Sequence, residues 1–166
     1  GCADEPAMEI DKDMESSHGR RDQNEANILN DYILDCLNIG SKSDTGEPIL
    51  PPFYGGSFIE PDGNLKIFVV GDSISAVSKI KKISDSEILR FQSAEFSYQE
   101  LLDVNQAIVR AIENGGPMAV KKNISAFGLN VGCNAVEVYL IDNSETKIEE
   151  FKKMYNHPCL MFSQLD

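Results

Sequence analysis

Apolar and polar positions alternate along residues 53–72, and this alternation predicts a β-hairpin. Leu65, Ile67 and Val69 fall at every second position, the period that a pleated strand imposes on side chains facing one side. The Pro-Asp-Gly-Asn segment before them contains Gly63, which can adopt the positive φ that tight turns use. The segment is therefore predicted to form two strands joined by a turn.

The same pattern returns in the second half of the chain and predicts an internal repeat. A second hairpin is predicted over residues 127–142, and Phe162 follows that hairpin as Phe91 follows the first. A repeated unit is the most economical explanation of such matched spacings. Three further pairs share one common spacing: Asn64 and Asn134, Val70 and Leu140, and Asp72 and Asp142.

Apolar residues three and four positions apart predict a helix before each hairpin and another after it. The helix after the first hairpin has Asp72 or Ser73 as its predicted cap, and the helix after the second has a capping box that begins at Asp142. A third strand follows each of these two helices. The predicted helices begin at Asn24, at Asp72 or Ser73, at Ser97 and at Asp142, and the third strands cover residues 87–91 and 159–162.

The order of elements is thus helix, strand, strand, helix, strand, and then the same five again. We predict an α+β protein of two repeated αββαβ lobes, each a small, antiparallel-rich sheet packed against helices. Residues 1–22 mix charged and small polar residues without periodicity and are predicted to be a flexible tether. The predicted N-terminal lobe covers residues 23–95 and the C-terminal lobe residues 96–166.

Composition narrows the classes of function. The chain has 166 residues, of which 42% are hydrophobic, enough to build a core. A formal net charge of −12 argues against nucleic acid and anionic membrane surfaces as partners, because both would repel the protein. No apolar run approaches the roughly 20 residues that span a bilayer. No cofactor is predicted.

The cysteines predict no metal site. Their spacing contains no C-x-x-C pair and the sequence has only two histidines, so the ligand pattern of a tetrahedral zinc site is missing. Among Cys36, Cys133 and Cys159 at most one disulfide can form, and the pairing stays open.

Cys2 is a separate case, because it precedes an acidic run that resembles the mature start of a bacterial lipoprotein. This predicts lipid attachment at Cys2 and a location outside the cytoplasm, either in the cell envelope or secreted. The alternative is an incidental cysteine in a disordered tail.

Several segments together indicate a family. They are Phe53-Tyr54-Gly55-Gly56, Asp62-Gly63-Asn64-Leu65, Leu89-Arg90-Phe91, Phe96-Ser97-Tyr98-Gln99-Glu100-Leu101, and the second hairpin with Gly128 and Asn134. Over residues 53–165 the chain resembles the pro-region of secreted, chymotrypsin-like serine proteases of the alpha-lytic protease and streptogrisin type.

The resemblance implies a protein partner, a serine protease in the same chain or a separate one. In that family the pro-region is a two-lobed intramolecular chaperone. It lends a sheet to the protease, stabilises the folding transition state and afterwards inhibits the enzyme through the C-terminal tail. Carried over by position, the resemblance implies that the partner-binding residues are Leu160, Met161, Phe162, Ser163, Gln164 and Leu165.

A catalytic alternative starts from Ser73. Residues 67–74 run as a strand into Gly-Asp-Ser at a helix start, which resembles the nucleophile block of the Gly-Asp-Ser-Leu hydrolases. His157 would have to serve as the base, but it has no Asp three residues before it, and no oxyanion-hole block is apparent. We therefore favour a capping role for this segment and predict that the protein is not an enzyme.

The leading hypothesis is a non-catalytic, secreted or lipid-anchored module that acts by protein–protein contact, either as chaperone and inhibitor or as a derived binding domain. It predicts an unpaired sheet edge in the C-terminal lobe. Two alternatives remain: a small Gly-Asp-Ser-type esterase, and a structural protein of cell-envelope assembly.

Overall fold

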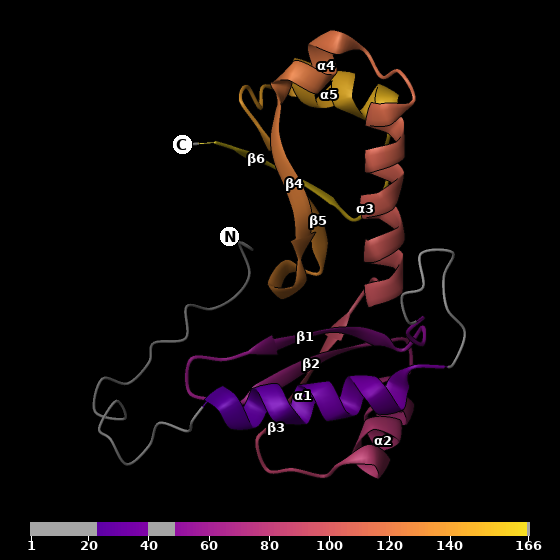
Figure 1. The fold of residues 1–166 in the computed structure, drawn as a ribbon, viewed down its shortest axis with the longest axis vertical. Helices are drawn as coiled ribbons and strands as arrows, with labels where there is room; N and C mark the ends of the chain where they lie inside the picture. Colours follow the sequence, from indigo (N-terminus) through magenta and orange to yellow (C-terminus); the bar gives the residue numbers. More distant parts are fainter. Residues whose placement is uncertain (1–22, 40–48, 166) are drawn as a thin grey trace. The chain divides into compact units, whose positions relative to one another are not determined.

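The chain folds as two units, unit 1 ending at Gln99 and unit 2 beginning at Glu100. The computed structural model in Figure 1 describes residues 23–39 and 49–165. The predicted tether, residues 1–22, and with it Cys2, lies outside the described residues. Among the described helices, none has the length and apolar character needed to cross a membrane.

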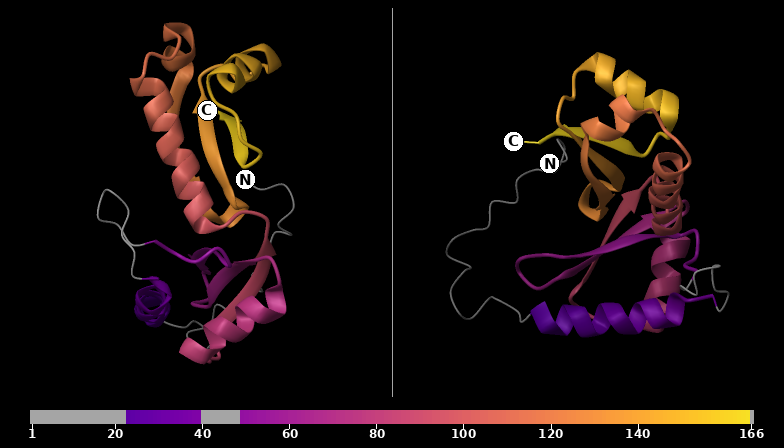
Figure 2. Two further views of the ribbon diagram at one scale, coloured as in Figure 1. Left: turned by 90° about the vertical axis from the view of Figure 1, so that its right-hand side faces the viewer. Right: turned by 45° about the horizontal axis from the view of Figure 1, so that its top comes forward.

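Unit 1 has the predicted order of helix, strand, strand, helix, strand. Its elements are α1 (Gln23–Leu37), β1 (Tyr54–Ile59), β2 (Leu65–Val70), α2 (Ser73–Ile83) and β3 (Leu89–Ala94). Both helices lie on the same side of the sheet (Figures 1 and 2). The core joins Ile33 of α1 and Ile80 of α2 to the alternating residues Leu65, Ile67 and Val69 of β2, as the pattern predicted.

Unit 2 repeats this order and adds two short elements. Its elements are α3 (Tyr98–Glu113, which begins at the end of unit 1), α4 (Met118–Asn123), β4 (Ile124–Asn130), the 3₁₀ turn η2 (Val131–Cys133), β5 (Ala135–Leu140), α5 (Glu145–Met154) and β6 (Leu160–Gln164). The short α4 was not predicted. The buried side chains include Leu101, Val104 and Ile108 of α3 and Phe151 of α5. The prediction of two αββαβ lobes, each with a sheet packed on helices, is confirmed.

Each sheet is mixed, so the prediction of antiparallel-rich sheets is wrong. The strand orders are β1-β2-β3 and β4-β5-β6. The hairpin strands pair antiparallel, whereas β3 pairs parallel to β2 and β6 parallel to β5. A helix that crosses one face of the sheet returns the chain to the same end, so the strand after it runs parallel to the strand before it.

The register confirms the repeat and corrects one of its spacings. Equivalent pairs are Tyr54–Val69 and Ile124–Leu140 within the hairpins, and Ile67–Phe91 and Val138–Phe162 between second and third strands. Corresponding residues in the second and third strands of the two units are therefore separated by one more position than corresponding residues in the first strands. The counterpart of Leu140 is Val69 rather than Val70, because the turn that contains η2 is one residue longer.

The helices after the two hairpins begin differently. Asp72 caps α2 as predicted, since its carboxylate accepts hydrogen bonds from the amides of Ile74 and Ser75 at 3.1 and 3.3 Å. The predicted capping box at Asp142 is wrong: the N-cap of α5 is Ser144. Asp142 instead accepts the Ser144 amide at 2.9 Å, a local turn that ends before the helix begins.

The structure answers the open question of disulfide pairing for Cys36 and Cys159, whereas Cys133 is disulfide-bonded. Cys36 is free and exposed, and Cys159 is free and buried. Since neither forms a disulfide, no bridge joins any two of Cys36, Cys133 and Cys159.

The packing of β6 gives a first prediction. The ring of Phe162 meets the fully buried Phe151 of α5 edge to face, at a centroid distance of 5.3 Å and an angle of 77°. Phe151→Ala is expected to lower the free energy of unfolding of unit 2 by about 3–5 kcal/mol, because it removes this contact and leaves a cavity. Urea denaturation measures the change, with Ile74→Ala (84% exposed in α2) as the near-neutral control. Equal effects of the two substitutions would contradict the assigned packing.

Candidate functional site

The predicted partner-binding residues, Leu160 to Leu165, form the outer strand of the unit 2 sheet and the residue after it. In the order β4-β5-β6, the only strand beside β6 within the described residues is β5 (Figure 1). The structure therefore places these residues on a sheet edge, as the leading hypothesis requires.

The direction of the backbone groups can be assigned along β6. Two bonds link its ends to β5: the Val136 amide donates to the Cys159 carbonyl at 3.0 Å, and the Leu165 amide donates to the Leu140 carbonyl at 3.1 Å. Backbone groups alternate along a strand, so Leu160, Phe162 and Gln164 point away from β5. The Leu160 amide is used in a turn to the His157 carbonyl at 3.1 Å. The outer edge therefore offers the C=O group of Leu160 and the N–H and C=O groups of Phe162 and Gln164.

The other sheet edges are protected by features that β6 does not share. β1 and β4 each have a register irregularity near their start. Such irregularities hinder pairing with another strand. In β3, the outward carbonyl of Leu89 accepts a hydrogen bond from the Arg90 side chain at 2.8 Å, and so does the Glu87 carbonyl. The counterpart of Arg90 in β6 is Met161, which has no side-chain donor.

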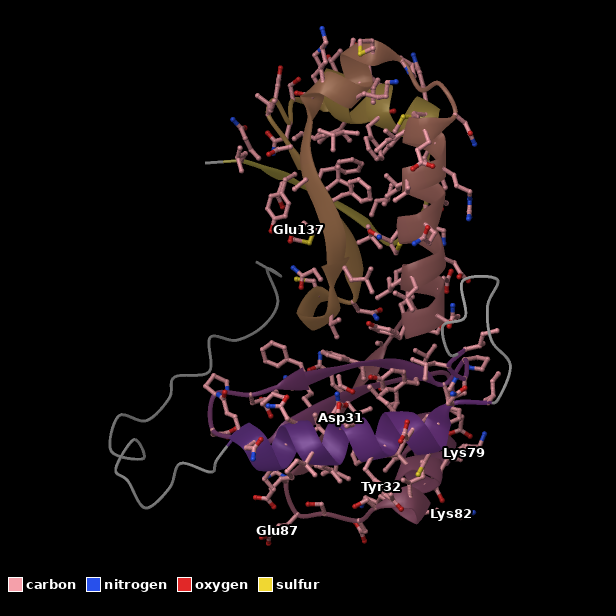
Figure 3. All side chains as sticks on the ribbon, viewed as in Figure 1. Asp31, Tyr32, Lys79, Lys82, Glu87 and Glu137 are labelled. Carbon is pink, nitrogen blue, oxygen red and sulfur yellow. The ribbon has the colours of Figure 1, made fainter. Side chains whose placement is uncertain are left out.

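A carboxylate connects β6 to the rest of its sheet. Glu137 of β5 (labelled in Figure 3) lies on the face opposite Val138 and Phe162, here called the outer face. Only 6% of this residue is exposed. Its oxygens accept three side-chain hydrogen bonds, from Asn130 Nδ2 at 3.0 Å, Tyr139 OH at 2.8 Å and Ser163 Oγ at 2.5 Å. The donors come from β4, β5 and β6, so one carboxylate links all three strands.

These hydrogen bonds stabilise the ionised form of Glu137. The Ser163 hydroxyl is the largest influence and lowers the pKa of Glu137 below its ordinary value of 4.5, with smaller contributions from Tyr139 and Asn130 that help to outweigh the opposing effect of burial. The sequence analysis missed this residue. The available signal was an acid at an alternating position between two buried valines, Val136 and Val138, in a predicted strand.

His157 fixes the turn that leads into β6. Its Nδ1 accepts the Cys159 amide at 3.0 Å, so Nδ1 carries no proton. The proton is therefore on Nε2, which lies 3.0 Å from Glu100 Oε2 and donates to it. This arrangement joins the first turn of α3 to the start of the edge strand.

The residues of the hydrolase alternative belong to different units and have other partners. Ser73 is the first residue of α2 in unit 1, where the Asp72 carboxylate binds helix amides. His157 belongs to unit 2, where both of its ring nitrogens are bonded. Cys159 is no better as a nucleophile, because burial raises the pKa of its thiol to about 11. Among the described residues, no cluster of His, Cys, Asp or Glu is arranged to hold a metal ion.

The two free thiols are expected to differ in reactivity. At pH 8 only about one Cys159 thiol in a thousand is ionised, since that pH is about three units below its pKa. Iodoacetamide should therefore modify the exposed Cys36 and leave Cys159 intact in the folded protein, whereas both react in denaturant. Peptide mass spectrometry follows the reaction, and rapid alkylation of native Cys159 would show that the assigned environment is wrong.

Glu137 predicts an acid-dependent part of stability. Because the pKa of Glu137 is lower in the folded state, its contribution to stability is complete above about pH 4.5. That contribution is lost as the pH falls through the lowered pKa. The difference in unfolding free energy between the wild type and Glu137→Gln is expected to shrink from about pH 6 to about pH 3. Urea titrations at several pH values measure it, and a difference that stays constant would contradict the assigned bonds.

Comparison with known families agrees with the division into two units. Residues 16–94 match the Pro-like N-terminal domain, and residues 99–165 match the Pro-like C-terminal domain. No significantly similar protein was found among curated proteins. The two matches follow one another in the order of the units and together span the helices and strands of the described residues. The chain therefore belongs to the Pro-like domain family, with a Pro-like N-terminal domain followed by a Pro-like C-terminal domain, the two lobes of a protease pro-region.

Proposed function

We propose that this protein is a pro-region module that binds a chymotrypsin-like serine protease by adding a strand of the enzyme to the outer edge of β6. The observation that carries the proposal is the regular edge of β6, where Phe162 and Gln164 direct backbone groups away from β5. A peptide strand can satisfy those groups directly, which is how sheet edges recognise extended chains.

The comparison between the two sheets supports the choice of edge. β3 and β6 occupy equivalent places in the two units, and both are outer strands. Arg90 donates a hydrogen bond to the outward Leu89 carbonyl of β3, whereas Met161 at the equivalent place in β6 has no side-chain donor for an outward carbonyl. We therefore assign the binding role to unit 2 and a supporting role to unit 1.

The family supports the choice of partner. Pro-like domains are associated with proteases, and the segments noted in the sequence resemble pro-regions that restrain secreted serine proteases. The proposed partner is thus a protease in the same precursor or a separate one, outside the cytoplasm. Binding by an edge needs no catalytic group on the module, which agrees with the assignment of Ser73 and His157 to different units.

The experiment measures inhibition of alpha-lytic protease and of a streptogrisin by the purified chain, using hydrolysis of a peptide nitroanilide. Saturable inhibition is expected. Gln164→Pro removes one outward N–H without touching a bond to β5, and should weaken inhibition at least about tenfold because a hydrogen bond is lost and the ring blocks the incoming strand.

The repeat offers a matched control for this substitution. Ser93 is the counterpart of Gln164 in β3 and also points outward, so Ser93→Pro makes the same chemical change on the edge of unit 1. The Ser93→Pro variant should inhibit the protease as strongly as the wild type does, and thermal unfolding should show that both variants fold. Equal losses in the two variants would refute the choice of edge. No inhibition of either protease by the wild type would refute the protease-restraining role and favour a derived binding domain.

A further inference from the structure

The outer edge of β6 can bind a strand only if its own backbone is already extended. An outer strand has one neighbour, so half of its backbone groups contribute nothing to holding it in place. Strand addition to a loosely held edge must first order that edge, and this ordering weakens binding. A side chain that anchors β6 to β5 would therefore act on binding without touching the partner.

Glu137 is in a position to do this. Its Oε2 accepts a hydrogen bond from the hydroxyl of Ser163, which lies in β6 between Phe162 and Gln164, two residues whose backbone groups point outward. Its Oε1 is held by Asn130 and Tyr139, so the carboxylate cannot turn away from β6 without breaking these two bonds. The bond to Ser163 is charge-assisted and shielded from solvent, which makes it stronger than an exposed neutral bond.

Unit 1 has different residues at the equivalent places. Lys66 stands where Glu137 stands, and its ion pair with Glu60 at 3.8 Å lies within the β1–β2 hairpin. Phe68 stands in place of Tyr139 and has no hydroxyl to donate. The three-strand carboxylate network is therefore a property of unit 2, the unit in which Met161 stands in place of Arg90.

From this placement we propose that Glu137 is the positioning residue of the β6 edge, and that its hydrogen bond to Ser163 holds the strand ready for addition of a protease strand. The effect of Glu137 on binding rests on the proposed function. The effect of Glu137 on the order of β6 does not, because it concerns the free protein.

The experiment compares Ser163→Ala, Ser163→Thr and Glu137→Gln, with Gln92→Ala as the matched change in β3. Amide hydrogen exchange measured by NMR reports the order of β6 directly. Ser163→Ala is expected to reduce the protection of the Leu165 amide, which bonds to Leu140, at least about tenfold, while amides of β4 and α5 keep theirs. Ser163→Thr keeps the hydroxyl and should restore protection, and Glu137→Gln should give an intermediate loss.

The inhibition assay provides the second readout. Ser163→Ala should weaken inhibition about tenfold and Ser163→Thr should recover it, whereas Gln92→Ala should change neither exchange in β6 nor inhibition. The inference is overturned if exchange rises uniformly through unit 2, if threonine does not rescue, or if exchange in β6 rises while inhibition is unchanged. If the wild type inhibits neither protease, the proposed function fails, and the exchange data still decide whether Glu137 orders β6.

Discussion

The helical crossover between the second and third strands is the constraint on which the rest of this structure depends. In both units, the helix after the hairpin carries the chain back across one face of the sheet, so the third strand pairs parallel to the second. Among the described residues, no further strand joins either sheet beyond the third. Each unit therefore has an outer strand with one row of backbone groups facing outward. The edge is a consequence of the topology, before any side chain is considered.

The two units differ in the side chains at their outer strands. In unit 1 the Arg90 guanidinium satisfies the outward carbonyl of Leu89. In unit 2 the equivalent residue is Met161, and the sheet is joined across its outer face by Glu137. A repeat of closely similar topology thus carries one edge whose outward carbonyl is bonded by a side chain and one edge whose corresponding residue, Met161, has no side-chain donor. The difference rests on a few side chains and leaves the core pattern of both units unchanged, so a new function can arise on one copy of a fold without altering the other.

If a partner strand is to pair with β6, the edge of β6 has to be both ordered and exposed. The strand is anchored on one face by the contact of Phe162 with Phe151 and on the other by the bond of Ser163 to Glu137. His157 fixes the turn before the strand through bonds to Glu100 and to the Cys159 amide. These three anchors hold the strand in place, while the backbone groups of Phe162 and Gln164 point away from β5. Preorganisation of this kind reduces the entropy lost on binding.

The sequence by itself determined the repeated helices and strands, although not the short α4. Alternation in β2 and the three-and-four spacing in α3 specify buried residues, because burial of apolar side chains follows local period. The same spacing fails in α1 and at the start of α2, where Ile28, Tyr32 and Ile74 are exposed. The family resemblance also followed from residues read in order. The direct cap of α2 by Asp72 was predictable for the same local reason. Tertiary structure decided what depends on neighbours distant in the chain, such as the parallel pairing of β6 and the one-residue offset of the second hairpin. The network around Glu137 joins residues 130, 137, 139 and 163, whose spacing in the sequence has no period. Hydrogen bonds between strands depend on register, and register is fixed only when the sheet has formed.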